Sequence, residues 1–167
     1  MSARAREAFR KDVHERALGL LAVRPRSRRE LERRLSAAGF DDDEVADELE
    51  RLERVGLVDD EAFARALAEH AFERRKAGRR AVASALAAKG VAPAVASAVL
   101  DDLDGAGDAD RADDLAQARA VRLAGVPADK AFQRLTGFLV RRGHAPEAAR
   151  DAARRALRLD GVSGAEG

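Results

Sequence analysis

Residues 56–91, GLVDDEAFARALAEHAFERRKAGRRAVASALAAKGV, carry the pattern that decides the fold. Asp59 and Asp60 stand where a helix N-cap belongs, because a carboxylate accepts hydrogen bonds from the free N–H groups of a first turn. Apolar side chains then recur every three or four residues, which is typical of one face of an amphipathic helix. Gly78 interrupts the pattern, a second apolar stripe follows, and Gly90 ends it in the manner of a helix-stopping glycine. The stretch predicts two helices with a short joint between them.

The same pattern occurs three times, and the helix-stopping glycines Gly39, Gly90 and Gly143 reveal its period. A leucine or valine stands eight and four residues before each glycine, and a helix start follows two or three residues after it. The glycines are 51 and then 53 residues apart. Self-similarity of this length indicates units that share their apolar faces with their neighbours. We therefore predict an all-α fold, an elongated array of three tandem three-helix repeats.

The repeat also predicts the domain boundaries. These are 1–11 for a basic, partly disordered N-terminal segment, 12–58, 59–107 and 108–160 for the three repeats, and 161–167 for a disordered tail. The first helix is expected from about Asp12 to Val23, and the pair Ser27 and Glu30 is typical of a capping box at the start of the second. The Asp- and Gly-rich joint 101–114 is expected to be the most flexible point.

Composition narrows the classes of function. The 167 residues include 31 basic and 30 acidic side chains, so the net charge of +1 identifies no partner. Cysteine is absent, which excludes disulfides and thiolate metal sites. No apolar run approaches the roughly 18 residues of a membrane span, and the N-terminus lacks the apolar core of a signal peptide. We expect a cytoplasmic monomer that does not contact membranes.

The sequence contains no convincing catalytic or metal-binding constellation. His14, His70 and His144 fall in different repeats without metal-ligand spacing, and we interpret them as surface or boundary residues. The acidic run 41–44 lacks the spacing of a calcium loop and is better explained by favourable charge at a helix N-terminus. No Ser–His–acid or Cys–His arrangement can be assembled. We therefore predict no enzyme activity, no cofactor and no metal.

Basic side chains recur at similar positions in the three repeats, and they are the candidate interaction surface. They could form one ridge that meets phosphates or an acidic protein surface. Alternatively, they could be a solvated face in which the nearby glutamates Glu30, Glu32, Glu69 and Glu73 pair with arginines. The missing Trp and Tyr argue against base stacking on single strands. The candidate contact residues are Arg28, Arg29, Arg33, Arg74, Arg75, Lys76, Arg79, Arg80, Lys89, Arg141 and Arg142.

Several of these motifs are shared with a known family. The chain resembles the RecX family, the regulatory proteins that modulate the RecA recombinase, over about residues 14–157. The resemblance rests on S-x-x-E-L-x-x-x-L-x-x-x-G at 27–39, LVDDEAFA at 57–64, KGV at 89–91 and FL-x-RRG at 138–143. His144 departs from the pattern, because it stands where the family usually has an aromatic residue.

The resemblance implies a non-enzymatic modulator built from tandem three-helix units. Such a protein binds in the helical groove of the RecA–DNA filament and restrains ATP hydrolysis, strand exchange and the coprotease activity of the SOS response. The basic residues named above would then carry the contact by charge pairing, with DNA phosphates within the filament as a further contact. The alternative is a helix-turn-helix-like regulator that acts directly on duplex DNA.

Overall fold

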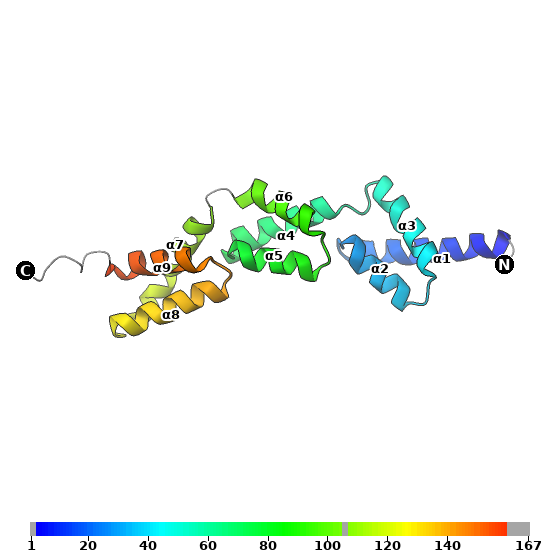
Figure 1. Cartoon of the computed structure of the whole chain (residues 1–167). Helices are drawn as coiled ribbons and strands as arrows, with labels where there is room; N and C mark the ends of the chain where they lie inside the picture. Colours follow the sequence, from blue (N-terminus) through cyan, green and yellow to red (C-terminus); the bar gives the residue numbers. More distant parts are fainter. Residues whose placement is uncertain (1–2, 105–106, 160–167) are drawn as a thin grey trace, which may run out of the picture. The chain divides into compact units, whose positions relative to one another are not determined.

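The computed structural model describes residues 3–104 and 107–159, in which helices alternate with short turns (Figure 1). The first repeat comprises α1 (Ala3–Val23), α2 (Arg28–Ala37) and α3 (Asp42–Arg54). The second comprises α4 (Asp60–Arg75), α5 (Arg79–Ala88) and α6 (Pro93–Asp104). The third comprises α7 (Gly107–Ala120), the short 3-10 helix η1 (Val121–Leu123), α8 (Ala128–Arg141) and α9 (Pro146–Leu157). These residues contain no strand, and the predicted all-α array of three three-helix repeats is confirmed.

The chain forms two compact units. Unit 1 consists of the described residues up to Arg65 together with Leu86–Ala96. Unit 2 consists of Ala66–Ala85 together with the described residues from Ser97 onward. Helices α4, α5 and α6 of the second repeat therefore each contribute to both units, whereas the first and third repeats lie in one unit each. None of the described helices is long and apolar enough to cross a bilayer.

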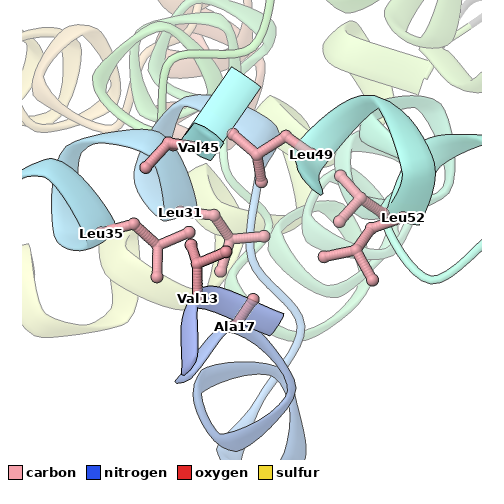
Figure 2. Close-up of a cluster of buried hydrophobic side chains, with 8 residues drawn as sticks. Val13, Ala17, Leu31, Leu35, Val45, Leu49 and Leu52 are labelled. Carbon is pink, nitrogen blue, oxygen red and sulfur yellow. The ribbon is translucent and has the colours of Figure 1, made fainter. Parts of the chain in front are cut away.

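The core of unit 1 consists of side chains from α1, α2 and α3 together with Val58, which follows α3 (Figure 2). Leu31 and Leu35 of α2 are fully buried between side chains of the two other helices. Because residues four apart share one helix face, this packing follows directly from the predicted apolar stripe. Burying a leucine or valine side chain contributes about 1.5–3 kcal/mol. The full cluster is Val13, Ala17, Leu31, Leu35, Val45, Leu49, Leu52 and Val58.

In unit 2, the hydrophobic cluster of the third repeat is made mostly of small side chains. Its two large fully buried residues, Leu135 and Leu139, come from α8 and lie four residues apart. The others are alanines, which let α7, α8 and α9 approach closely: Ala112, Ala116, Ala149, Ala152 and Ala153. Partly buried side chains, including Phe132 and Phe138, pack around this cluster. The third repeat therefore has a continuous apolar core although it is rich in alanine.

The three helix-stopping glycines behave as predicted. Gly39, Gly90 and Gly143 have φ of +91°, +77° and +91°, which glycine adopts without strain. After each glycine, the next N–H group donates to a carbonyl of the helix that has just ended, as in a Schellman motif. These bonds are Phe40 to Leu35 (3.3 Å), Val91 to Leu86 (3.1 Å) and His144 to Leu139 (3.2 Å). Phe40, Val91 and His144 therefore occupy equivalent positions in the three repeats.

Two boundary predictions need correction. Helix α1 begins at Ala3 rather than near Asp12, so the described part of the segment 1–11 is helical. Residues 3–11 contain Ala, Arg, Glu and Lys without Gly or Pro, and these good helix formers extend the helix although they add no apolar stripe. In the joint 101–114, α6 continues to Asp104 and α7 begins at Gly107. Residues 105–106 and the predicted tail 161–167 lie outside the described residues.

The joint between α4 and α5 also differs from expectation. The sequence predicts that Gly78 interrupts the helix, but the residue with a left-handed backbone conformation at this joint is Lys76, with φ of +50°. Gly78 is required for a different reason, because a β-carbon there would overlap the backbone of Gly143 and His144. A close approach between distant segments therefore explains this glycine, and sequence spacing alone could not reveal it.

Candidate functional site

Unit 1 contains a junction at the start of α2, which we call the first junction. The Ser27 hydroxyl oxygen accepts from the N–H of Glu30 (3.2 Å), so Ser27 caps α2 as predicted. The same hydroxyl donates to the carbonyl of Lys89, in the turn after α5. The N–H of Arg28 donates to the Asp60 carboxylate at the start of α4 (2.8 Å). Polar groups at the N-terminus of α2 are thus hydrogen-bonded to two segments that follow much later in the chain.

Glu30 is the charged centre of the first junction. Its Oε1 accepts from Arg24 (2.5 Å), Arg26 (2.5 Å) and Arg34 (3.0 Å), and both Glu30 and Arg26 are buried. Burial alone would raise the pKa of the Glu30 carboxyl, but the three guanidinium hydrogen bonds outweigh it and lower the pKa to about 2. The predicted capping box is therefore only half correct, because Glu30 pairs with these arginines while Ser27 forms the cap.

Unit 2 contains the equivalent arrangement at the start of α5, which we call the second junction. The N–H of Gly78 donates to the Arg142 carbonyl (2.9 Å), and the N–H of Arg80 donates to the Gly143 carbonyl (3.1 Å). A β-carbon on Gly143 would come too close to Ala81 at the start of α5. Here the turn after the second helix of the third repeat lies directly against the backbone of α5.

The two junctions share one distinctive hydrogen bond. The N–H of Arg79 donates to the Asp108 carboxylate of α7 (3.1 Å), just as Arg28 donates to Asp60. Arg79 lies 51 residues after Arg28, the spacing of the first two helix-stopping glycines. In each case an aspartate at the start of one repeat caps the second helix of the preceding repeat. The local sequence pattern predicts Asp60 only as part of its own helix start, and it does not single out Asp108.

A buried arginine fills the second junction from the side of α7. Arg111 donates from Nε to the Ala77 carbonyl (3.1 Å) and from Nη2 to Asp104 (2.5 Å). Its guanidinium carbon also lies 3.9 Å from the centroid of the Phe72 ring, within the range of a cation–π contact. All three contacts are within unit 2, so Arg111 is a structural residue and is not available to a partner.

His144 completes the second junction. The side chain is fully buried, with Nδ1 3.0 Å from Asp108 Oδ1 and Nε2 3.0 Å from the Lys76 carbonyl. Burial alone would raise the pKa of the Asp108 carboxyl, but its hydrogen bonds to His144 and to the Arg79 N–H lower that pKa. The interpretation of the histidines as surface or boundary residues agrees with the exposure of His70 and the partial exposure of His14. It is wrong for His144, whose side chain is buried because the turn after α8 packs against the start of α5, more than 60 residues earlier in the chain.

Four of the eleven predicted contact residues have partners within the chain. These four, Arg28, Lys76, Arg79 and Arg142, are half-buried. The ion pairs join Arg28 to Glu53 (3.1 Å), Lys76 to Asp114 (3.2 Å) and Arg79 to Asp101 (2.6 Å), and the Arg142 side chain donates to the Arg75 carbonyl. Each of these four charged side chains therefore has an acceptor within its own unit.

The other seven predicted contact residues are exposed. None of them forms a salt bridge with another residue in the described part of the chain, and neither do the nearby Glu32, Glu69 and Glu73. The alternative of a face laced with Glu–Arg pairs therefore holds for Glu30, which pairs with Arg24, Arg26 and Arg34, but not for Glu32, Glu69 and Glu73. The seven are Arg29, Arg33 and Lys89 in unit 1, and Arg74, Arg75, Arg80 and Arg141 in unit 2.

In unit 1 the exposed cations gather at the first junction. Arg29 lies against Gly90, because a β-carbon on that glycine would come within 2.7 Å of the arginine side chain. Lys89 immediately precedes Gly90, and Arg33 follows Arg29 by one turn of α2. We call Arg29, Arg33 and Lys89 the unit-1 basic patch.

In unit 2 the exposed cations lie on both sides of the second junction. Arg74 and Arg75 end α4, and Arg80 lies in the first turn of α5. The Arg141 guanidinium turns back along α8, where it would lie 3.3 Å from a β-carbon on Gly137. We call Arg74, Arg75 and Arg80 the unit-2 basic patch, and we treat Arg141 separately. No group of three or more His, Asp or Glu side chains is placed to hold a metal ion in the described residues.

Comparison with known families gives two matches, one to each of the first two repeats. Residues 14–52 match the model described as RecX, first three-helix domain. Residues 59–100 match the model described as RecX, second three-helix domain. The boundaries of these matches fall within the predicted repeats 12–58 and 59–107.

Curated relatives cover most of the chain. Regulatory protein RecX of Mycolicibacterium smegmatis is 43% identical over 145 residues, which is 84% of this chain and 76% of the relative. Regulatory protein RecX of Corynebacterium efficiens is 36% identical over 159 residues, or 92% of this chain and 76% of the relative. The crystal structure of RecX from Lactobacillus salivarius has the same fold, with a TM-score of 0.83 at 18% identity over 92% of this chain and 99% of that one.

Proposed function

The chain belongs to the RecX family of regulatory proteins, and from this membership we propose that it binds the RecA–DNA filament and inhibits recombinase activity. The activities that it would restrain are ATP hydrolysis, strand exchange and the coprotease activity of the SOS response. The protein would act in the cytoplasm by binding alone, without chemistry of its own. The observation that carries the proposal is the family match to both of the first two repeats, joined to the exposed basic patches.

We assign the contact to the seven exposed cations rather than to all eleven predicted residues. An exposed arginine or lysine without an internal salt bridge keeps its charge available for an acidic surface or a phosphate. By contrast, Arg79 and Arg28 would have to give up internal carboxylate partners before they could bind anything else. The structural role of the four half-buried cations therefore supports a division between contact residues and junction residues.

Two patches on one chain suit a partner that repeats. Each patch alone offers a few charge pairs, and exposed charge pairs contribute only about 0.2–1 kcal/mol each. When both patches bind one filament, the second contact forms at a high effective concentration, which raises the overall affinity without any new contact. An assembled filament would therefore be bound in preference to free RecA subunits.

The helix-turn-helix alternative has less support from the geometry. A groove-reading helix presents its N-terminal residues to base edges. However, the first N–H groups of α2 are capped by Asp60 and Ser27, and those of α5 by Asp108 and the turn after α8. The acidic helix α3, which begins with Asp42, Asp43 and Glu44, would be repelled by phosphates. Direct duplex binding is therefore kept as an outcome of the test below.

The experiment measures DNA-dependent ATP hydrolysis by RecA in the presence of the purified chain. One variant carries Arg29→Glu, Arg33→Glu and Lys89→Glu, and a second carries Arg74→Glu, Arg75→Glu and Arg80→Glu. The matched control reverses Arg54 and Arg134, which are exposed cations outside both patches. We expect each triple variant to inhibit much less than the parent, with helicity unchanged, while the control inhibits fully.

Two outcomes would contradict the proposal. Full inhibition by both triple variants would remove the basic patches from the contact. Tight, salt-sensitive binding to duplex DNA with no effect on RecA would favour the helix-turn-helix alternative.

A further inference from the structure

His144 lies between two acceptors, and this geometry points to a function for its proton. We propose that His144 is a proton-dependent latch in unit 2. In this latch the doubly protonated ring joins Asp108, at the start of α7, to the Lys76 carbonyl between α4 and α5. Loss of one ring proton would open the connection and loosen the start of the third repeat from that joint. This inference does not depend on the proposed function.

The two acceptors around His144 require two donors on the ring. Nδ1 lies 3.0 Å from Asp108 Oδ1, and Nε2 lies 3.0 Å from the Lys76 carbonyl oxygen. A carbonyl oxygen only accepts, and so does an ionised carboxylate. A neutral imidazole has a single N–H, so one of its nitrogens would direct a lone pair at an oxygen. With the ring fully buried, water cannot relieve that repulsion, and only the imidazolium satisfies both contacts.

The charges around the ring also favour the imidazolium. Unit 2 places four carboxylates in this network, of which Asp101 and Asp104 belong to α6 and Asp108 and Asp114 belong to α7. The permanent cations paired with them number three: Lys76 at the α4–α5 joint, Arg79 of α5 and Arg111 of α7. A charged His144 supplies the fourth positive charge. Arg142, which precedes the turn, directs its side chain to the Arg75 carbonyl instead.

The residue at this position differs among the repeats. The position equivalent to His144 holds Phe40 in the first repeat and the buried Val91 in the second. The first junction thus has the same aspartate bond, from Arg28 to Asp60, without an ionisable side chain at this position. Dependence on a histidine proton is therefore specific to the second junction, and the first junction serves as an internal control.

The backbone at Lys76 agrees with a latch at this point. Lys76 has φ of +50°, a conformation that residues with side chains rarely adopt. Its carbonyl is the acceptor for His144 Nε2, and its Nζ pairs with Asp114 (3.2 Å). Both contacts stabilise an unfavourable backbone conformation at Lys76. Losing one of them should therefore destabilise the joint between α4 and α5.

The direction of the pH dependence follows from the two groups that meet in the latch. The latch needs His144 charged, so it is complete at lower pH and is lost as the pH rises and the ring gives up a proton. It also needs Asp108 ionised, so it is lost again in strong acid. The latch is therefore complete only while His144 is charged and Asp108 is ionised.

The first experiment reads the protonation of the ring directly. The 15N resonances of the histidine rings of the full chain are recorded at neutral pH, with the exposed His70 as the reference. We expect both ring nitrogens of His144 to carry protons, as its two acceptors require. A single neutral tautomer of His144 at neutral pH would overturn the proposal, and this measurement needs no variant.

The second experiment reads the junction itself by amide hydrogen exchange, corrected for the intrinsic effect of pH. From mildly acidic to mildly alkaline pH, the N–H groups of Arg79 and Arg80 should lose about tenfold in protection, as expected when one hydrogen bond to a charged group is lost. The Arg28 N–H of the first junction should show no such loss. The variants His144→Val and His144→Phe, which carry the residues of the other repeats, should abolish the pH dependence. Equal dependence at both junctions, or its persistence in the variants, would refute the latch.

Discussion

The two junctions perform one task with different side chains. In both, an aspartate at the start of a repeat caps the second helix of the preceding repeat, and the turn after a later helix lies against the same helix start. The first junction is centred on the buried Glu30 and its arginines, whereas the second has Ala81 at that position and relies on backbone contact, Arg111 and His144. The backbone arrangement is thus maintained across the repeat while the chemistry that stabilises it changes.

The largest loss of stability is expected when the charged centre of the first junction is removed. Glu30→Ala installs the residue of the second junction, but it leaves the buried Arg26 without its carboxylate. Removing one partner of a buried ion pair costs about 3–5 kcal/mol. The free energy of unfolding is measured by urea denaturation with far-UV circular dichroism, since the chain lacks Trp and Tyr. The exposed Glu32→Ala on the same helix is the control and should change stability by less than about 0.5 kcal/mol. A loss for Glu30→Ala as small as that of the control would show that the first junction does not depend on this carboxylate.

The Glu30 carboxylate also predicts that the free energy of unfolding decreases in acid. The folded-state pKa of Glu30 is about 2, below its ordinary 4.5, so the stabilisation is present above pH 4.5 and is lost as pH falls toward 2. The difference in unfolding free energy between the parent and Glu30→Ala should therefore shrink over this interval. Asp108 also titrates in acid, but it is present in both proteins and cancels from the difference. A difference that stays constant with pH would show that Glu30 does not act through its charge.

The next effect compares two glycines that have the same backbone conformation. Gly39 and Gly143 both have φ of +91°, but only Gly143 lies against another helix start. Gly39→Ala should cost about 1–2 kcal/mol for the left-handed conformation alone. Gly143→Ala should cost about 1–3 kcal/mol more, because its methyl group would overlap Ala81. Equal losses in denaturation experiments would mean that the close approach at the second junction is not needed.

The smallest loss of stability is expected when Ser27 of the first junction is replaced by the residue at the equivalent position of the second junction. Ser27→Gly places glycine at the position of Gly78, and it removes the cap on α2 and the bond to the Lys89 carbonyl. We expect a loss of about 1–2 kcal/mol in the free energy of unfolding, mostly from the Lys89 carbonyl that loses its donor, because glycine is itself tolerated at an N-cap. Exposed Ser97→Gly on α6 reports the cost of glycine in a helix without a junction contact. If the two losses match, the hydroxyl of Ser27 contributes nothing to the junction.

The basic residues show how far the sequence could locate the site. Arg79 and Arg80 are adjacent and identical in type, and both were assigned to the contact surface. Arg79 pairs with Asp101 and Asp104, whereas Arg80 is exposed. The carboxylates that separate the two roles lie more than 20 residues away on α6, and no local pattern predicts which arginine they reach. The exposed patches were therefore contained in the predicted set, but they could not be separated from the junction residues.

The sequence by itself determined the helices, their caps and stops, and the three-fold period. These features depend on interactions within one or two turns of chain: Asp41 and Asp59 cap α3 and α4, and Gly39, Gly90 and Gly143 adopt positive φ after helices. Only the tertiary structure decided the burial of His144, the need for glycine at position 78 and the second role of Asp60. Each of these results from contacts between segments that are tens of residues apart, where packing rather than local conformation selects the neighbour.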